Sequence, residues 1–270
     1  MNRPNRTLYL LAIVLVAAGC GRMEGRRGRA ADGPKVTISR SWPAAEIDHL
    51  RVFEIDGSIT VNAEATDTIT LVATAQGDLE RKKGAENEGL FETRLDGDTL
   101  RIGRKEHRRK GWTFPILFGR NDMRIHYVLK VPTTLTLDVS TINGRITTRG
   151  GEAETEASTV NGTIDIETAG TKELQATTVN GRVKARFTRD FQGARFKTVN
   201  GGVEAFLPQN ASFNVDLSQV NGDFEASFPL NIHSNPGSRR VSGEVNGGQH
   251  ELKIVTVNGD VELARLNGTL

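Results

Sequence analysis

The sequence repeats one short motif, an aliphatic residue followed by Asn and Gly, along its second half. Copies include STVNGTI, TTVNGRV and KTVNGGV, and the asparagines stand at positions 143, 161, 180, 200, 221, 246, 258 and 267. The first intervals are 18, 19, 20 and 21 residues, and the later ones are 25, 12 and 9. A nearly fixed period of about 20 residues indicates a repeat architecture in which each copy supplies one structural unit. Two earlier stretches, IDGSITV at 55–61 and LDGDTLRI at 95–102, resemble degenerate copies with Asp in place of Asn.

The segments between the motifs have the composition of β-strands. Stretches such as TITLVATA and LTLDVST alternate in polarity and are rich in Thr, Val, Ile and Leu, and a helical period is absent nearly everywhere. We therefore predict an all-β chain with one β-strand-repeat domain at 36–270. Its first part, 36–135, is irregular, and the Asn-Gly repeats occupy 136–270.

Asn-Gly between strands usually predicts a two-residue hairpin. At 177–183 such a hairpin pairs Thr178 with Val183 on an apolar face but leaves Val179 at the turn, and this misfit recurs at every copy. A parallel, β-helix-like β-solenoid with coils of about 20 residues removes it. At each corner the aliphatic residue would turn inward, Gly would supply backbone freedom, and Asn would stack on the Asn of the next coil. An antiparallel meander or β-sandwich stays open as the alternative. The predicted corner residues are Asn143, Gly144, Asn161, Gly162, Asn180, Gly181, Asn200, Gly201, Asn221, Gly222, Asn258 and Gly259.

Charged residues after the corners offer a second test of parallel stacking. Asp165, Lys184 and Glu204 occupy the third position after Gly in successive copies, so their signs alternate. This order brings opposite charges together only if equivalent strands lie side by side.

The N-terminus has the pattern of a secretory signal. Arg3 and Arg6 precede a short apolar stretch, which ends in small residues before Cys20, the only cysteine. This arrangement resembles a bacterial lipoprotein processing box, which implies removal of residues 1–19 and acylation of Cys20, for example with palmitate. Residues 20–35 then form a flexible basic tether. Removal of residues 1–19 takes away two arginines and no acid, so 35 basic residues become 33, equal to the 33 acidic ones. This balance argues against nucleic-acid binding.

The run VLKVPTTLTLDVSTINGRITT, followed by the TVNG copies, resembles the DUF4097 family of β-strand-repeat proteins, whose members are described as adhesin-like. The resemblance extends over about 36–270 and implies a β-helical envelope or secreted protein. It supplies no catalytic residues.

Chemical motifs are otherwise sparse. The five histidines share no ligand spacing and the single cysteine is assigned to the anchor, so no metal, cofactor or catalytic residue is predicted. Four acids, Asp223, Glu225, Asp260 and Glu262, leave one alternative open, in which carboxylates on a β-helix cleave a glycan.

One segment at 104–122, RKEHRRKGWTFPILFGRND, stands apart from the repeat. Basic charge beside aromatic and aliphatic side chains suits a membrane interface or an anionic glycan. The segment would equally serve as a cap on the open end of the coils, which a repeat protein requires. The predicted contact residues are Arg104, Lys105, Arg108, Arg109, Lys110, Trp112, Phe114 and Phe118.

These observations predict a non-enzymatic, lipid-anchored protein of the bacterial cell envelope, in the outer membrane if the organism has one. Its β-repeat domain would serve adhesion or scaffolding, with an envelope protein or an anionic glycan as partner. Two alternatives remain open. One is the glycan-processing enzyme, and the other is an envelope-stress sensor that binds a membrane-active ligand.

Overall fold

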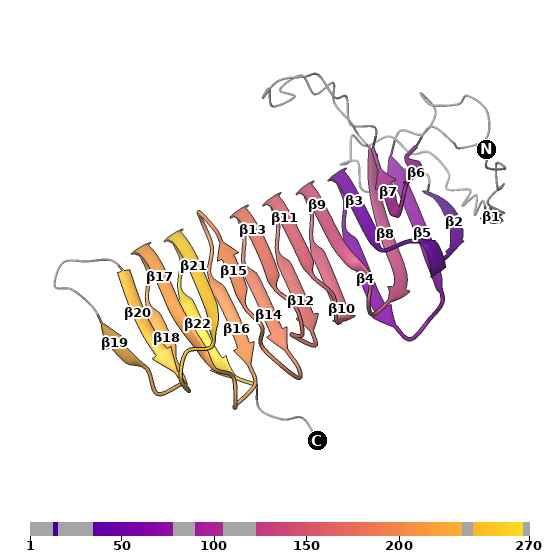
Figure 1. The fold of residues 1–270 in the computed structure, drawn as a ribbon. Coiled ribbons are helices and arrows are strands. Elements are labelled where there is room, and N and C mark those ends of the chain that lie inside the picture. The colour runs from indigo at the N-terminus through magenta and orange to yellow at the C-terminus, as the bar shows by residue number, and fades with distance from the viewer. Residues whose placement is uncertain (1–12, 16–34, 78–89, 105–122, 234–239, 267–270) are drawn as a thin grey trace, which may run out of the picture.

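The computed structural model describes residues 13–15, 35–77, 90–104, 123–233 and 240–266. Within this part the chain forms strands β1 to β22 and one short 3-10 helix, η1 (Ala44–Glu46). The strands stack along one long axis in an elongated molecule (Figure 1). The prediction of an all-β chain is confirmed.

The strands belong to two sheets of eleven strands each, here called sheet A and sheet B. Sheet A, in spatial order, contains β1 (Ile13–Leu15), β2 (Lys35–Pro43), β5 (Thr68–Gly77), β8 (Met123–Pro132), β4 (Ile59–Glu64), β10 (Ile146–Gly151), β12 (Ile164–Thr168), β14 (Val183–Phe187), β16 (Val203–Leu207), β22 (Val261–Arg265) and β18 (Phe224–Ala226). Sheet B contains β19 (Asn231–His233), β20 (Arg240–Val245), β17 (Phe213–Asn221), β21 (His250–Asn258), β15 (Ala194–Lys197), β13 (Leu174–Asn180), β11 (Thr155–Asn161), β9 (Thr136–Asn143), β3 (His49–Asp56), β7 (Thr99–Gly103) and β6 (Glu92–Asp96).

Both sheets are mixed. From β3 to β17 in sheet B and from β8 through β4 to β18 in sheet A, neighbouring strands are parallel. Towards the ends, β2–β5, β5–β8, β6–β7, β17–β20 and β19–β20 are antiparallel. A wholly parallel arrangement is therefore wrong for the ends.

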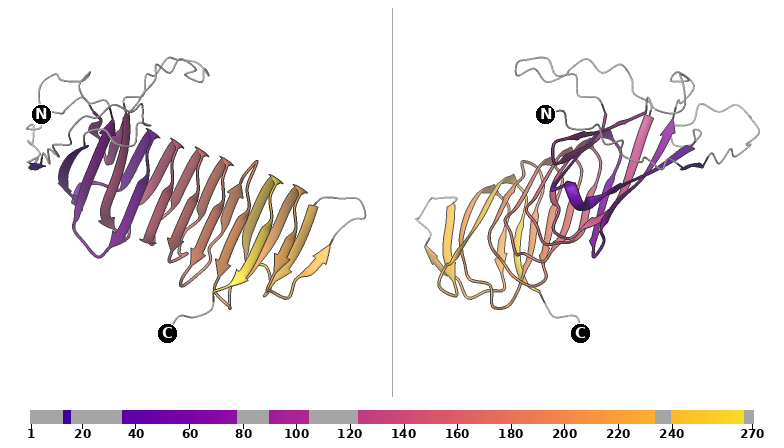
Figure 2. Two further views of the ribbon diagram at one scale, coloured as in Figure 1. Left: turned by 180° about the vertical axis from the view of Figure 1, so that it is seen from behind. Right: turned by 45° about the vertical axis from the view of Figure 1, so that its right-hand side comes forward.

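In the central region each motif joins a strand of sheet B to a strand of sheet A. The chain passes from β13 through Asn180 and Gly181 to β14, yet β13 pairs with β11 and β15 rather than with β14. Successive coils thus lie side by side, as the two views in Figure 2 also show. The charge order agrees with this arrangement, since Lys184 pairs in register with Asp165 on one side and Glu204 on the other.

Alternating burial along most of the strands produces one core between the sheets. In β13, Leu174, Ala176 and Thr178 are buried, whereas the residues between them are not. Small inward side chains recur in the middle of the stack, and larger ones such as Phe187, Phe191 and Phe213 gather towards the C-terminal end, where their rings meet edge to face. Burial of these side chains supplies the main driving force for folding.

Three copies of the motif depart from the simple series. The copy at 245–247 forms a turn between β20 and β21, which both belong to sheet B, and is therefore not a coil corner. The last coil, β21–β22, lies between β15–β16 and β17–β18, so the spatial order of coils differs from their order in the chain. The stretch at 95–102 forms the antiparallel hairpin β6–β7 with Gly97 at φ 63°, and is therefore not a coil corner. The stretch at 55–61 does form one, because β3 and β4 continue the parallel series.

Candidate functional site

Six asparagines of the motif form a continuous ladder where the strands of sheet B end, whereas Asn246 instead donates to the carbonyl oxygen of Ala211. The amide of each asparagine donates a hydrogen bond to the Oδ1 of the next one, at 2.8 or 2.9 Å. At one end Asn143 donates to the carboxylate of Asp56 at 2.8 Å. The six predicted Asn-Gly corners therefore share one column. Its spatial order is Asp56, Asn143, Asn161, Asn180, Asn200, Asn258 and Asn221.

Glycine is required beside the ladder because adjacent coils approach closely. A Cβ on Gly162 would lie 1.7 Å from the carbonyl oxygen of Gly144, and one on Gly181 would lie 1.8 Å from that of Gly162. None of these three glycines adopts the left-handed conformation that excludes other residues. The expectation that Gly supplies dihedral freedom is therefore wrong at these three corners, where the missing side chain is what the corner needs. It holds at the other three, since Gly201, Gly222 and Gly259 have φ of 159°, 130° and 156°.

Buried threonines satisfy the carbonyl groups at the same corner. The hydroxyl of Thr178 donates to the carbonyl oxygen of Gly162 at 3.2 Å, and Thr198 donates in the same way to Gly181 at 3.2 Å. Such bonds offset the cost of removing a carbonyl group from water. The row consists of Thr141, Thr159, Thr178, Thr198 and Thr256.

The aliphatic residue before each asparagine points outward. Val160, Val179, Val220 and Val257 are between 36% and 43% exposed. The prediction that these residues turn inward at the corner is wrong, because the alternation of the strand already places the preceding threonine inside. Only Val245, in the antiparallel strand β20, is buried. The result is an exposed aliphatic row on the outer face of sheet B. Its exposed members are Val160, Val179, Val257 and Val220. Ile55, Ile142 and Val199 complete the row and are half-buried, and Val199 follows the end of β15 rather than lying within it.

At the N-terminal end, the threonine row is replaced by a buried ion pair. Glu54 pairs in register with Thr141, and its fully buried carboxylate lies 2.9 Å from Nε of Arg104. The hydroxyl of Tyr127 donates to the other carboxylate oxygen at 3.0 Å. Burial raises the pKa of the Glu54 carboxyl, and the charge of Arg104 opposes this change. Burial, followed by the charge of Glu54, also raises the pKa of Tyr127.

This pair corrects the assignment of Arg104 as a membrane or glycan contact. Its side chain is only 8% exposed, and its guanidinium also donates to the carbonyl oxygen of Met123 at 2.9 Å. Sequence analysis did not identify Glu54, although the alternation in VFEID could have placed it inward. The remaining predicted contact residues, 105–118, lie outside the described residues, as does Cys20.

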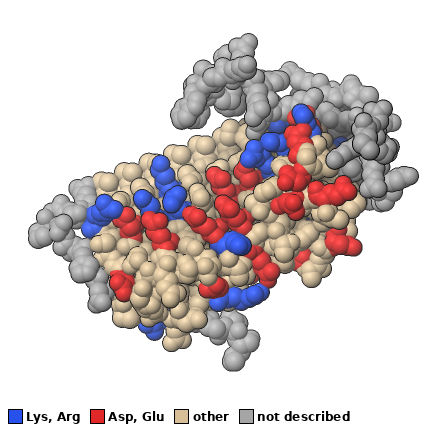
Figure 3. Space-filling view, in the orientation of Figure 1, with Lys and Arg blue, Asp and Glu red and all other residues tan. Residues whose placement is uncertain are grey.

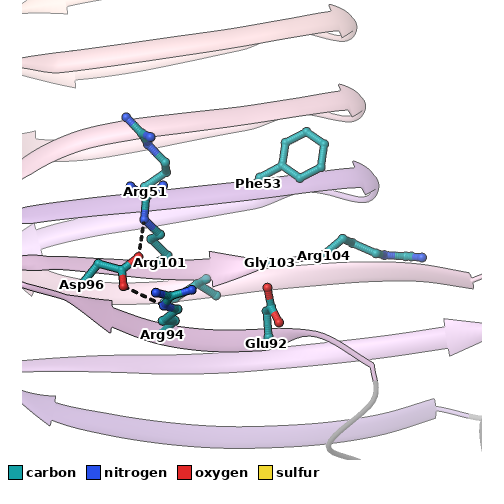
Figure 4. A pocket seen from close by; sticks show the side chains of 9 residues that line it. Arg51, Phe53, Glu92, Arg94, Asp96, Arg101, Gly103 and Arg104 are labelled. Atoms are coloured by element: carbon teal, nitrogen blue, oxygen red, sulfur yellow. Dashed lines mark ion pairs between the residues drawn. The ribbon is translucent and has the colours of Figure 1, made fainter. Parts of the chain in front are cut away.

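A hollow of about 230 Å³ opens beside this ion pair, along β3, β6 and β7. Figure 4 shows Arg94 and Arg101 pointing towards Asp96, with ion-pair distances of 2.6 and 3.1 Å. Arg104 extends away from them in the same view. Arg51 reaches Asp138 on the neighbouring strand. The arginines of the hollow therefore form ion pairs with acidic residues of the same chain.

Carboxylates gather on sheet A near the C-terminal end. Glu204 pairs in register with Glu262, which in turn pairs with Glu225. Asp223 and Asp260 line the same groove of about 380 Å³, together with Arg182, whose guanidinium bonds Glu204 at 2.6 Å. The structure therefore does bring together all four acids singled out in the sequence. A metal-binding cluster of three or more His, Cys, Asp or Glu residues is absent from the described part of the chain.

Over the described ranges, the chain contains no helix of the length and apolarity needed to cross a bilayer.

The fold and the corner define a class of all-β protein in which coils are joined by Asn-Gly corners and locked by an amide ladder. The chain belongs to the Toastrack DUF4097 family, whose model matches residues 32–264. Among curated proteins, no sequence matches the chain significantly.

Solved structures that are similar include a proposed cell adhesion protein from Clostridium sporogenes, at 9% identity and a TM-score of 0.43, covering 85% of this chain and 99% of that one. A proposed adhesin from Bacteroides fragilis shares 9% identity, with a TM-score of 0.30 and coverage of 85% and 97%. A proposed lipid-binding protein from Parabacteroides distasonis shares 12% identity, with a TM-score of 0.29 and coverage of 86% and 97%.

Proposed function

We propose that the chain is a non-catalytic protein of the bacterial cell envelope whose stacked coils present a fixed surface to a binding partner, in adhesion or in scaffolding. We include in the proposal that the central coils form a β-solenoid, because their neighbouring strands pair in parallel and in register. The observation that carries the proposal is the exposed aliphatic row on sheet B. Exposed aliphatic side chains that form one continuous row are typical of a contact surface rather than of scattered surface residues.

The proposal includes lipid attachment at Cys20 and a position outside the cytoplasm, in the outer membrane if the organism has one. It draws on the signal pattern, on the tether at 20–35, and on Gly21 rather than Asp after the cysteine. Two or three acyl chains would hold the chain stably at a bilayer, whereas one would not. Strand β1 lies within the segment predicted to be removed, so cleavage would free the edge of β2 with which it pairs.

Attachment is tested by labelling cells with radioactive palmitate and separating their envelopes. The wild-type chain should carry label and sediment with the envelope. The Cys20→Ser variant should lose both properties, because no other thiol is present to be acylated. An unlabelled wild-type chain would contradict the anchor and leave the contact surface to be judged separately.

The contact surface is tested by binding of purified envelopes to immobilised protein. Replacing Val160, Val179 and Val257 with Lys should abolish binding. A matched control replaces Val72 and Val128, which are equally exposed at 40% and 43% but lie in β5 and β8, away from the row. The control should bind like the wild type. Equal loss in both variants would show that added charge, rather than the row, is responsible.

A glycan-processing enzyme is the second candidate, because the groove on sheet A gathers Glu204, Glu225 and Glu262 on three adjacent strands. Paired carboxylates are the usual means of glycoside hydrolysis. A product assay on purified envelope glycans decides this question. Turnover that disappears in Glu225→Gln and Asp223→Asn would establish the enzyme and overturn the non-catalytic proposal.

A further inference from the structure

The outer face of sheet B carries a charged row that runs across seven strands in register. Each residue of the row is paired in register with the next one on the neighbouring strand, so the strand register fixes the spatial order of the row. In order, the row is Arg51, Asp138, Glu156, Gln175, Arg195, Lys253 and Asp216. Both signs also appear along the length of the molecule on the face that Figure 3 shows.

The signs of this row are antisymmetric about Gln175. The side of β9 and β11 carries Asp138 and Glu156, whereas the side of β15 and β21 carries Arg195 and Lys253. At the outer positions Arg51 stands opposite in sign to Asp216. If a second copy of the row is placed against the first in reverse order, every charged residue faces a residue of opposite charge. The neutral Gln175 then faces Gln175 of the second copy.

We propose that this face binds the same face of a second copy, with the two-fold axis parallel to the strands and passing along β13. The inference deepens the proposed function, on which it rests, by naming the partner of this face. Rotation about such an axis leaves the position of each row along the strand direction unchanged and reverses the order of the strands. Glu156 then faces Arg195 of the second copy, Asp138 faces its Lys253, and Arg51 faces its Asp216.

The central charges are available for such contacts. Within the part of the chain that the structure describes, Glu156, Arg195 and Lys197 form no ion pair with another side chain, and all three are exposed. The outer charges already have partners, since Arg51 pairs with Asp138, and Asp216 with Arg240. Most of the electrostatic gain from pairing would therefore come from the positions that flank β13.

The neighbouring rows obey the same symmetry. The aliphatic row maps onto itself, with Val179 at the centre and Val160 opposite Val199 of the second copy. Between the two rows lies Thr177, with Ser158 on one side and Lys197 on the other. Lys197 thus adds positive charge near Glu156 of the second copy. Apolar contact would supply affinity, and the charges would fix the register.

The size of the face suits a dimer. Seven strands spaced about 4.8 Å apart and about seven residues long, at about 3.3 Å per residue, give roughly 650 Å² per copy. The total of roughly 1,300 Å² falls within the range of specific interfaces. A uniformly anionic polymer would fit less well, because Asp138 and Glu156 would repel it along half of the face.

Sedimentation of the full chain in detergent tests the proposal through charge reversal. The wild type should form a dimer that weakens at high salt, because exposed ion pairs are screened. Glu156→Arg and Arg195→Glu should each weaken dimerisation by roughly 10- to 100-fold, since each places like charges together twice. The double variant should regain the dimer, and an equimolar mixture of the two single variants should form a mixed dimer. Thermal melting confirms that each variant is folded.

Cross-linking at the axis supplies a second measurement. In a Cys20→Ser background, Thr177→Cys should be joined to its counterpart by a short bis-maleimide, because facing sheets lie about 10 Å apart. Thr147→Cys, on sheet A, should not be joined. A monomeric wild type, or a double variant that does not regain the dimer, would overturn the inference. If that monomer still bound envelopes through the aliphatic row, the proposed function would stand without it.

Discussion

The middle of the stack and its N-terminal end satisfy the polar groups buried beside the corners in two different ways. In the middle coils, each buried threonine donates to the glycine carbonyl of the adjacent coil, so every coil satisfies its neighbour. At the end, Glu54 occupies the same row and requires a cation, which Arg104 supplies from the strand end beside it. Repetition therefore stabilises the middle through many weak, identical bonds. The end depends on a single buried ion pair, and the described part of the chain contains no second pair of this kind.

The largest expected effect lies in the middle, at Gly162→Ala. The new Cβ would lie 1.7 Å from a backbone oxygen, so two coils would have to separate. We expect a loss of more than about 4 kcal/mol in the free energy of unfolding, measured with urea. Gly151→Ala is the control, since a Cβ there meets nothing within 4 Å. Equal stability of the two variants would contradict the close approach of coils as the reason for glycine.

The next largest effect is the difference in stability loss between a variant of the buried ion pair, at Glu54, and a variant of the threonine row, at Thr178. Glu54→Ala leaves the Arg104 charge buried without its partner and should cost about 3–5 kcal/mol. Thr178→Val removes one neutral hydrogen bond in the same row and should cost about 1 kcal/mol. Glu54→Gln, which keeps an acceptor for Tyr127 and Arg104, should fall between them. Urea unfolding measures all three, and similar costs for the first two variants would erase the contrast.

The smallest effect concerns the amide ladder. Asn180→Ala removes two amide hydrogen bonds, one to each neighbour, whereas Asn221→Ala at the end of the ladder removes one. Because the ladder is exposed to water, we expect a loss of about 1 kcal/mol for the first and about half of that for the second. Thermal unfolding of both variants supplies the comparison. A larger loss at Asn221 would show that the end of the stack, rather than the number of bonds, controls stability.

Much of the fold could be predicted from the sequence. The alternation of residues such as Leu174, Ala176 and Thr178 identified the strands and their inward faces, and the spacing of the motif located the six corners. The signs of Asp165, Lys184 and Glu204 predicted which strands lie side by side. These features are local or strictly periodic, so they are visible without knowledge of distant contacts.

Other features could not be obtained in this way. The insertion of β21–β22 between earlier coils depends on which stack of strands offers the better packing, and no spacing in the sequence records it. The pairing of Glu54 with Arg104 joins residues that are far apart in the chain and follows no repeat. The charged row on sheet B is likewise invisible in chain order, because Lys253 precedes Asp216 in space but follows it in sequence.

By itself, the sequence determined that this chain is all-β, that it turns at Asn-Gly corners, and that equivalent strands recur about every 20 residues. Only the tertiary structure decided that the aliphatic residues before those corners face solvent, that the glycines admit a neighbouring backbone, and that charges from separate coils form one antisymmetric row. The physical reason is the range of the interactions. Strand alternation and turn preference act within a few residues, whereas close approach and charge pairing depend on which coils become neighbours.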